Sequence, residues 1–292
     1  MTDRELLSML HRLLSYYRGV GIEKIPAGEG TDRLMAVLSN LHGREGTGNQ
    51  GTVSSSSPVS PHLSQSCSRA GSLPSAGSRK GAAQRRIRPE ECNSLVELRQ
   101  AMEACTRCRL HETRNHIVFG EGDEEARLML IGEAPGRNED LQGRPFVGKS
   151  GELLTKMLRA INIRRDQVFI TSVVKCRPPR NRTPSKDEIE ACLPWLQAQI
   201  KMISPEIILC LGSTAINAIL GREIPIARLR GSFHHTDWLP DVRIAVTYHP
   251  AYLLRFGGER QKALKLQAWH DLQMVEKEYK KVTGDTHNES DK

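Results

Sequence analysis

The sequence predicts an α/β protein: a three-layer αβα sandwich around a central, mainly parallel, four-stranded sheet. Four apolar runs bounded by turn residues have the length and composition of buried strands, and segments of helical periodicity separate them. Strands that alternate with helices form a parallel sheet covered on both faces. The predicted strands are 127–133, 168–174, 206–211 and 242–248, and the predicted helices between and after them are 149–161, 185–203, 213–220 and 259–282.

Length and composition suit such a protein. The chain has 292 residues, of which 38% are hydrophobic, and its formal net charge is +8. That length is enough for one large or two small domains. The sequence contains neither an apolar run of transmembrane length nor an N-terminal signal segment, so we expect a cytoplasmic protein that works at the nucleoid.

Two segments precede the predicted sandwich. Residues 1–43 are expected to form a helical segment, in which 2–18 carry an apolar stripe. This piece is either a small docking helix or part of a partner interface. Residues 44–89 are rich in Ser, Gly and Pro and hold seven Lys or Arg against one acid. Such a stretch cannot bury enough apolar area to fold. We expect a disordered basic linker that either holds a polyanion loosely or only separates the two parts.

The rest of the chain is expected to form one folded domain over residues 90–283, followed by a polar tail at 284–292. A short helix over 94–104 opens the domain. The helix over 185–203 begins with a Ser/Glu pair in capping-box spacing, which marks its start. The domain therefore has a helix before its first strand and a long helix after its last.

The loops at the carboxyl ends of the predicted strands carry residue types that suit a binding site. Glu133 follows the first strand in a Gly/Pro turn, Phe146 lies in the next loop, and His249 follows the fourth strand. Because parallel strands share their carboxyl edge, these side chains are expected at one place, where open α/β sheets bind ligands. Ordinary alternatives exist, since Phe146 can be a core residue and a lone histidine at a strand end is more often structural than catalytic.

Four of the seven cysteines have the spacing of a ligand set. Cys105 and Cys108 form a C-x2-C pair, and Cys176 and Cys192 follow far downstream. An odd number of cysteines in a chain expected to be cytoplasmic argues against a disulfide framework. Four thiolates suit zinc or an iron–sulfur cluster, and spacing favours neither. Four unrelated buried thiols are the alternative, a fair one for Cys192 on an apolar helical face.

A basic loop follows the second strand. Four cations stand within eight residues: Lys175, Arg177, Arg180 and Arg182. Such a concentration of positive charge is expected of a contact with the DNA backbone, and a solvated charged loop is the alternative. A second DNA contact is predicted at Leu253, Leu254 and Arg255, where the leucines are either core residues or a wedge that prises a base from its stack.

Four motifs resemble those of the family 4 uracil-DNA glycosylases, the iron–sulfur type. They are GEAPGRNED at 132–140, GRPFVGKSG at 143–151, VVKCRPPRNRTP at 173–184 and HPAYLLR at 249–255. The four cysteine positions match as well. The resemblance covers about residues 105–272 and is specific, because the motifs occur in the right order. It implies a uracil-DNA glycosylase-like fold in which the four cysteines hold a structural 4Fe–4S cluster.

The resemblance also implies roles for site residues. Phe146 stacks on the extruded uracil, backbone groups around Glu133 and Ala134 contact it, and His249 stabilises the leaving base. One position departs from the pattern: family members usually carry an Asn that reads uracil N3–H and O4, where this chain has Ser172. A hydroxyl cannot present that two-point contact. The departure predicts weaker uracil excision and greater tolerance of other deaminated bases.

These residue types suit hydrolysis of an N-glycosidic bond in a flipped nucleotide. Breaking the bond leaves negative charge on uracil O2, and His249 can donate a hydrogen bond to that oxygen as the charge develops. A carboxylate can orient the attacking water. Related glycosylases use an Asp at the position of Ala134, so Glu133 is the candidate here, with Asp140 and Asn181 behind it.

Two functions follow from the sequence. The first is a monomeric glycosylase that excises uracil from single- or double-stranded DNA without a metal in the chemical step. The second is an iron–sulfur or zinc DNA-binding module on the same fold, without turnover. Ser172 and Ala134 keep the second open, and Glu133, Phe146 and His249 argue against it.

Overall fold

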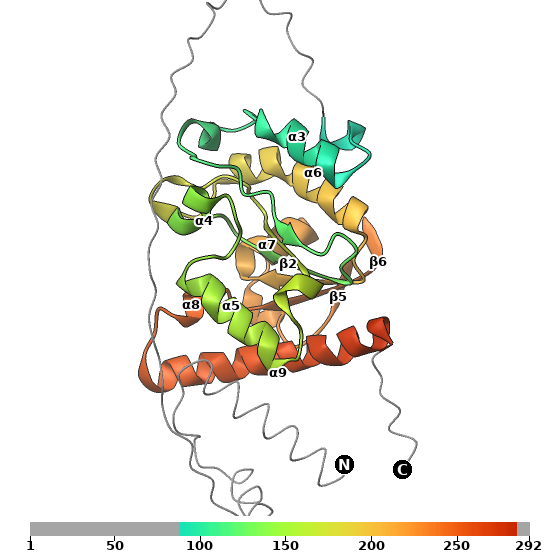
Figure 1. Cartoon of the computed structure of the whole chain (residues 1–292). Coiled ribbons are helices and arrows are strands. Elements are labelled where there is room, and N and C mark those ends of the chain that lie inside the picture. The colour runs from blue at the N-terminus through green and yellow to red at the C-terminus, as the bar shows by residue number, and fades with distance from the viewer. Residues whose placement is uncertain (1–87, 285–292) are drawn as a thin grey trace, which may run out of the picture. The chain divides into compact units, whose positions relative to one another are not determined.

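The computed structural model of the chain describes residues 88–284. A twisted sheet runs through the middle, with helices on both of its faces (Figure 1). The sheet has six strands in the order β1-β3-β2-β4-β6-β5. They are β1 (Glu121–Gly122), β2 (Leu128–Gly132), β3 (Phe169–Ser172), β4 (Ile207–Leu211), β5 (His234–Thr236) and β6 (Leu239–Thr247).

The four strands that the sequence predicts form the parallel centre of this sheet. Strand β2 pairs in parallel with β3 and β4, and β4 pairs in parallel with β6. Strands β1 and β5 add an antiparallel strand at each edge, so the expected number of four strands was too small. Neither edge strand has an apolar run: β1 is Glu-Gly and β5 is His-His-Thr. Strand β1 pairs with β3, which is remote in sequence, whereas β5 forms a hairpin with β6, which follows it directly.

The helices form the outer two layers. Helices α3 and α6 cover one face in Figure 1, and α5 and α9 the other. The helices are α3 (Leu95–Glu103), α4 (Arg137–Gln142), α5 (Lys149–Ala160), α6 (Lys186–Ile203), α7 (Ser213–Leu220), α8 (Pro250–Leu253) and α9 (Gly258–Thr283). Short 3-10 turns lie at Pro89–Glu91, Arg109–Glu112, Arg165–Gln167, Pro179–Asn181 and Ile226–Arg228. The predicted capping box is present, since Ser185 N donates to Glu188 Oε2 at 2.9 Å.

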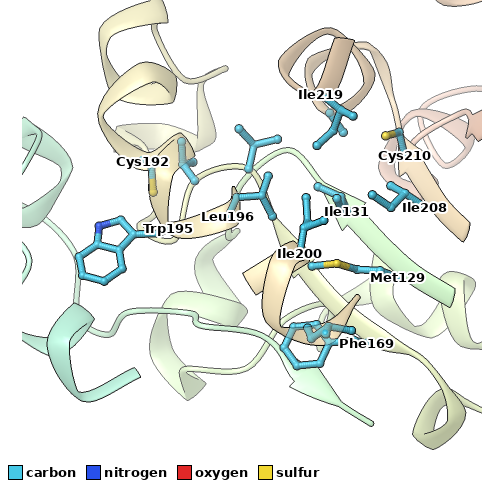
Figure 2. Packing of buried hydrophobic residues seen from close by; sticks show 14 of the residues in the cluster. Met129, Ile131, Phe169, Cys192, Trp195, Leu196, Ile200, Ile208, Cys210 and Ile219 are labelled. Carbon is cyan, nitrogen blue, oxygen red and sulfur yellow. The ribbon is translucent and has the colours of Figure 1, made fainter. Parts of the chain in front are cut away.

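The apolar face of α6 packs against the sheet and forms part of the hydrophobic core. Leu196 and Ile200 of α6 lie over Met129, Ile131 and Phe169 of the sheet (Figure 2). These residues are at most 1% exposed. Strands β2, β3 and β4 are buried along their whole length, because helices cover both of their faces. That double burial is the reason for the continuous apolar runs by which the sequence predicts them.

Some sequence predictions lie outside the described residues. The helix over 2–18, nearly all of the linker over 44–89, and the tail beyond residue 284 belong to these parts of the chain. Within residues 88–284, no helix is long and apolar enough to cross a membrane.

Candidate active site

A cavity of about 620 Å³ opens at the carboxyl edge of the parallel strands. Its volume falls in the range of small-molecule sites. Eight residues predicted for catalysis, base binding or DNA binding line it: Glu133, Ala134, Phe146, Ser172, Asn181, Arg182, His249 and Arg255. These residues come from loops after three different strands, so the fold brings together segments more than a hundred residues apart.

Phe146 forms one wall of the cavity. It has a left-handed backbone, with φ at 51°, which is uncommon outside glycine and is typical of residues held in place for function. Its ring lies across Gly132, where an added Cβ would come within 2.6 Å of the ring. The ring centroid is 5.6 Å from that of His249, at an interplanar angle of 30°. The two aromatic rings therefore contact each other in the wall of the cavity.

Glu139 holds the two loops of this wall together. Its carboxylate accepts hydrogen bonds from the backbone N–H of Gly136 at 3.1 Å, Val147 at 2.9 Å and Gly148 at 2.9 Å. The side chain is buried, and these donors satisfy its charge. Glu139 thereby fixes the turn after β2 against the loop that carries Phe146. Sequence reasoning gave this residue no role.

Glu133 lies at the cavity, and its partner comes from a distant helix. The hydroxyl of Thr214, in the first turn of α7, donates to Glu133 Oε2 at 2.5 Å. The preceding Gly212 has φ at 96°, and an added Cβ there would lie 3.2 Å from His249 Cβ. The corner between β4 and α7 therefore touches both candidate catalytic side chains. Sequence reasoning missed Thr214, because a hydroxyl at a helix start looks like an ordinary cap.

His249 has a defined tautomer. Its Nδ1 accepts a hydrogen bond from the backbone N–H of Ala251 at 3.1 Å, so the proton of the neutral ring is on Nε2. Burial lowers the pKa of His249 to about 4, and the positive charge of the nearby Arg255 adds to this shift. The negative charge of Glu139 acts in the opposite direction and is the smallest of the three effects. Near neutral pH the ring is therefore an uncharged hydrogen-bond donor at Nε2.

Ser172 lies in the floor of the cavity, 4% exposed, at the end of β3. Its Oγ is 3.3 Å from the position of a Cβ added to Gly132, beside the Phe146 ring. Its carbonyl oxygen accepts a hydrogen bond from Lys175 Nζ at 2.7 Å. The side chain is thus placed where it can meet the edge of a bound base.

The basic loop differs from the expectation at Lys175. This residue is 1% exposed, and its ammonium also donates to Thr171 Oγ1 at 2.5 Å and Gln199 Oε1 at 2.6 Å. The prediction that Lys175 contacts DNA is therefore wrong, because its charge cannot reach a phosphate. Burial lowers the pKa of Lys175 to about 7.

The three arginines of the basic loop differ in their hydrogen-bond partners and in their exposure. Arg182 is held by both oxygens of Glu188, at 2.6 and 2.8 Å, while its edge lines the cavity. Arg177 donates to Asn181 Oδ1 at 2.6 Å. Arg180 is exposed and, like Asn181, has a left-handed backbone, with φ at 55°. Arg177 and Arg180 thus remain accessible beside the cavity.

Two further predictions are corrected by burial. Asp140 is 1% exposed and accepts from the backbone N–H of Asn115 at 2.8 Å and from its side-chain amide at 2.5 Å. It anchors the loop before β1 and does not line the cavity, so it cannot orient a water there. Leu253 is fully buried and cannot be a wedge, whereas Leu254 is 44% exposed.

The four predicted metal ligands lie together. Cys105, Cys108, Cys176 and Cys192 line one small cavity of about 20 Å³, next to the end of α3 and the first half of α6. Arg114 Nη1 donates to Cys176 Sγ at 3.4 Å and to the Cys105 carbonyl at 2.8 Å. Burial raises the pKa of Cys176 to about 11 and of Cys192 to about 12.

The arrangement of these thiols is looser than a single-ion site. Within residues 88–284, no three His, Cys, Asp or Glu side chains converge closely enough to hold one metal ion. A tetrahedral zinc site needs sulfurs about 2.3 Å from one centre. The four cysteines line a cavity and do not converge on one point.

Comparison with known proteins places this geometry in a family. The uracil DNA glycosylase superfamily matches residues 119–273. A type-4 uracil-DNA glycosylase of Thermotoga maritima is 44% identical over 179 residues, which are 61% of this chain and 91% of that protein. One from Archaeoglobus fulgidus is 42% identical over 166 residues, 55% of this chain and 83% of that protein. A type-5 uracil-DNA glycosylase of Pyrobaculum aerophilum is 30% identical over 179 residues, 56% and 77% of the two chains.

Proposed function

The chain belongs to the uracil DNA glycosylase superfamily and, within it, to the type-4 uracil-DNA glycosylases, and we propose that it hydrolyses the N-glycosidic bond of uracil in DNA. It is a DNA-repair hydrolase that leaves an abasic site. The convergence of Glu133, Phe146 and His249 on one cavity carries this proposal. The alternative, a binding module without turnover, is not favoured, because the similar proteins are type-4 uracil-DNA glycosylases.

Base recognition uses the walls of the cavity. Extruded uracil stacks on Phe146, which the glycines around it and Glu139 hold in position. Backbone groups of Glu133 and Ala134 contact the base, and the Ser172 hydroxyl meets its polar edge. A hydroxyl rotates and acts as donor or acceptor, so it discriminates less strongly between deaminated bases than an amide would.

His249 stabilises the leaving base. As the glycosidic bond breaks, negative charge grows on uracil O2, and the Nε2–H of His249 donates to that oxygen. Because the ring is already neutral and fixed by Ala251, no reorganisation is needed when the charge appears. The donor therefore stabilises the transition state more than the bound substrate, which is what raises the rate.

Glu133 orients the water that attacks the sugar. Its carboxylate lines the cavity and accepts a hydrogen bond from Thr214 on one oxygen, which leaves the other oxygen for the water. Its negative charge also favours the positive charge that develops on the sugar. Asn181 lines the same cavity and supports the water from the opposite loop.

The four cysteines fit a 4Fe–4S cluster. Soft thiolates are the usual ligands of such clusters. The buried Lys175 has only neutral oxygen atoms as hydrogen-bond partners, and burying a cation without a countercharge is costly, so an anionic group in the adjacent cavity explains it. When bound, the cluster supplies a cross-link between the end of α3, the basic loop and α6. The chemical step uses none of these four residues.

DNA is held by the accessible part of the rim. Arg177, Arg180, Arg182 and Arg255 contact backbone phosphates, and the exposed Leu254 enters the base stack behind the extruded nucleotide. Replacing Arg177 and Arg180 together is expected to reduce the log–log salt slope of binding by about 0.9 for each phosphate that the variant no longer neutralises. We propose that the protein acts as a monomer, on single- or double-stranded DNA, at the nucleoid in the cytoplasm.

A uracil-release assay tests the proposed function directly. Purified protein is incubated with labelled DNA that carries one uracil, and alkali then reveals abasic sites as strand breaks. Breaks at uracil that disappear with Glu133→Ala and His249→Ala support a glycosylase. Tight binding of uracil-containing DNA without any release of base would instead support the module without turnover.

A further inference from the structure

One buried donor beside the cysteine cavity lacks a hydrogen-bond partner. The indole Nε1–H of Trp195 is buried and makes no hydrogen bond to any atom of residues 88–284. Trp195 is 2% exposed and lies in α6, three residues after Cys192. Buried N–H groups are almost always paired, because leaving one unpaired costs the hydration that it had in water. The indole N–H therefore indicates an acceptor that the described part of the chain does not itself provide.

The Trp195 side chain forms part of the wall of the cysteine cavity. Residues three apart on a helix lie on the same side of it, and Trp195 and Cys192 line the same cavity. Figure 2 shows both side chains on one side of α6, with the indole nitrogen on the ring edge nearer to the Cys192 sulfur. The donor is thus on the part of the ring that faces the cysteine ligands.

Sulfur is the acceptor that the side chains of this cavity offer. Besides the four cysteines and Met102, the lining side chains are hydrocarbon, cationic or the indole itself, and none of these carries an acceptor atom. Arg114 already donates to one cysteine, since its Nη1 lies 3.4 Å from Cys176 Sγ. A 4Fe–4S cluster adds inorganic sulfides to the thiolates that hold it. A buried N–H in the wall fits such a sulfur.

We propose that the Trp195 N–H donates a hydrogen bond to a sulfur of the iron–sulfur cluster and thereby raises the reduction potential of the cluster. Reduction adds negative charge to the cluster, and hydrogen bonds to its sulfurs stabilise that charge. The proposal rests on the cluster proposed above and goes beyond its structural role, and it does not depend on uracil excision. A phenylalanine ring would fill most of the same space, so the donor is what the indole adds.

The test removes the N–H and keeps the ring. Full-length wild type, Trp195→Phe and a variant that carries the benzothiophene analogue of tryptophan at position 195 are purified anaerobically, and their iron and sulfide are quantified. The analogue keeps the shape of the indole and has sulfur in place of the N–H. Met102→Leu is the matched control, because Met102 lines the same cavity, is 1% exposed and has no donor.

Resonance Raman spectra report the Fe–S stretching bands, and a redox titration followed by electron paramagnetic resonance gives the reduction potential. Both variants without the donor are expected to keep the iron of the wild type, with shifted Fe–S bands and a lower potential. Loss of one donor should change the one-electron reduction equilibrium about tenfold, which corresponds to about 59 mV. Met102→Leu should match the wild type in both measurements. Unchanged bands and potential in both donor variants, or an equal shift in Met102→Leu, would overturn the proposal.

The uracil-release assay on the same samples separates this proposal from the proposed function. A potential that falls when the donor is removed, in protein that releases no uracil, would support Trp195 as the donor and sink the glycosylase. Wild-type protein that releases uracil and contains no iron would overturn the cluster, and the role of Trp195 with it.

Discussion

At the residue scale, the cavity depends on contacts that no local pattern reveals. Thr214 and Glu133 are 81 positions apart in the chain, and their hydrogen bond exists only because β2 and β4 are neighbours in the sheet. For Lys175, the sequence pattern suggested an exposed side chain, and the fold buries it. A lysine in a run of arginines looks exposed, yet its stem points into the core toward Gln199. Residue type and spacing therefore predicted Glu133, Phe146 and His249, and could not predict which partners orient them.

Thr214 is expected to position Glu133. Thr214→Val keeps the shape and removes the donor, so single-turnover excision should fall about 10- to 100-fold, the value of a hydrogen bond to a charged group. Thr214→Ser should restore most of the rate. The decisive measurement is a double-mutant cycle: in a Glu133→Ala background, Thr214→Val should have almost no further effect. A full additive loss there would make Thr214 a structural residue only. Thr155→Val, a similar half-buried helical site, is the control.

His249→Ala is expected to lower the single-turnover rate by about 10²–10³ while DNA affinity changes little, because the donor acts mainly in the transition state. A loss confined to affinity would make it a positioning residue.

Folding lowers the pKa of His249 from 6.5 to about 4. The contribution of this group to stability is therefore complete above about pH 6.5 and is lost as the pH falls toward 4. Histidine NMR signals should therefore show His249 still neutral at about pH 5.5.

Ser172→Asn is expected to raise the rate of uracil excision and narrow the range of substrates. The amide would occupy the end of β3 in the cavity floor and pair with both polar positions of the base edge. The measurement is a single-turnover comparison of both proteins on DNA carrying uracil, hypoxanthine or xanthine. An unchanged ratio of uracil to hypoxanthine excision would assign recognition to the backbone near Glu133 instead.

At the scale of elements, the predicted secondary structure is confirmed where burial imposes a pattern. The strands of the sheet centre and the helices α5, α6, α7 and α9 match the predicted segments closely. The short helices α4 and α8 and the edge strands were missed, because elements of a few residues have no period to detect. Those missed elements lie beside the cavity or at the sheet edges, and β1 in addition pairs with a strand that is remote in sequence.

In the first turn of α5, the position of Gly151 has room for no side chain. A Cβ added to Gly151 would lie 1.8 Å from the carbonyl oxygen of Phe146. Gly151→Ala must therefore push the Phe146 loop away, and we expect a loss of about 1–3 kcal/mol in the free energy of unfolding together with weak excision. Gly257→Ala, which meets nothing within 4 Å, should cost less than about 0.5 kcal/mol. Urea unfolding and the release assay measure both.

At the scale of the whole molecule, the cysteine cavity joins parts of the domain that the sheet does not. Lys175 lines the cysteine cavity, and its ammonium donates to the carbonyl oxygen of Ser172 at 2.7 Å. One side chain therefore links the cysteine cavity to a residue of the base cavity. The sequence indicated this set of thiols by spacing. It could not indicate that the neighbouring cation is buried between the two sites.

We expect the purified protein to be brown, with an absorbance band at roughly 400 nm from thiolate-bound iron. Cys176→Ala should lose the band and lower the melting temperature, because a cross-link between three segments is gone. Cys92→Ala, outside the cavity, should keep both. Colourless protein with stoichiometric zinc after anaerobic purification would contradict the cluster.

The residues that line the base cavity extend along the chain from Val118 to Arg255. Thr247, two residues before His249, donates a hydrogen bond to Asp271 of α9 at 2.7 Å. On a ribosome, this order has a consequence in time. A nascent chain can pair β2 with β3 early, yet it has no catalytic histidine until the last strand emerges, and no anchored one until α9 follows. A message cut short anywhere before that helix should yield a polypeptide with no glycosylase activity at all, in place of a weakly active fragment loose among single-stranded DNA.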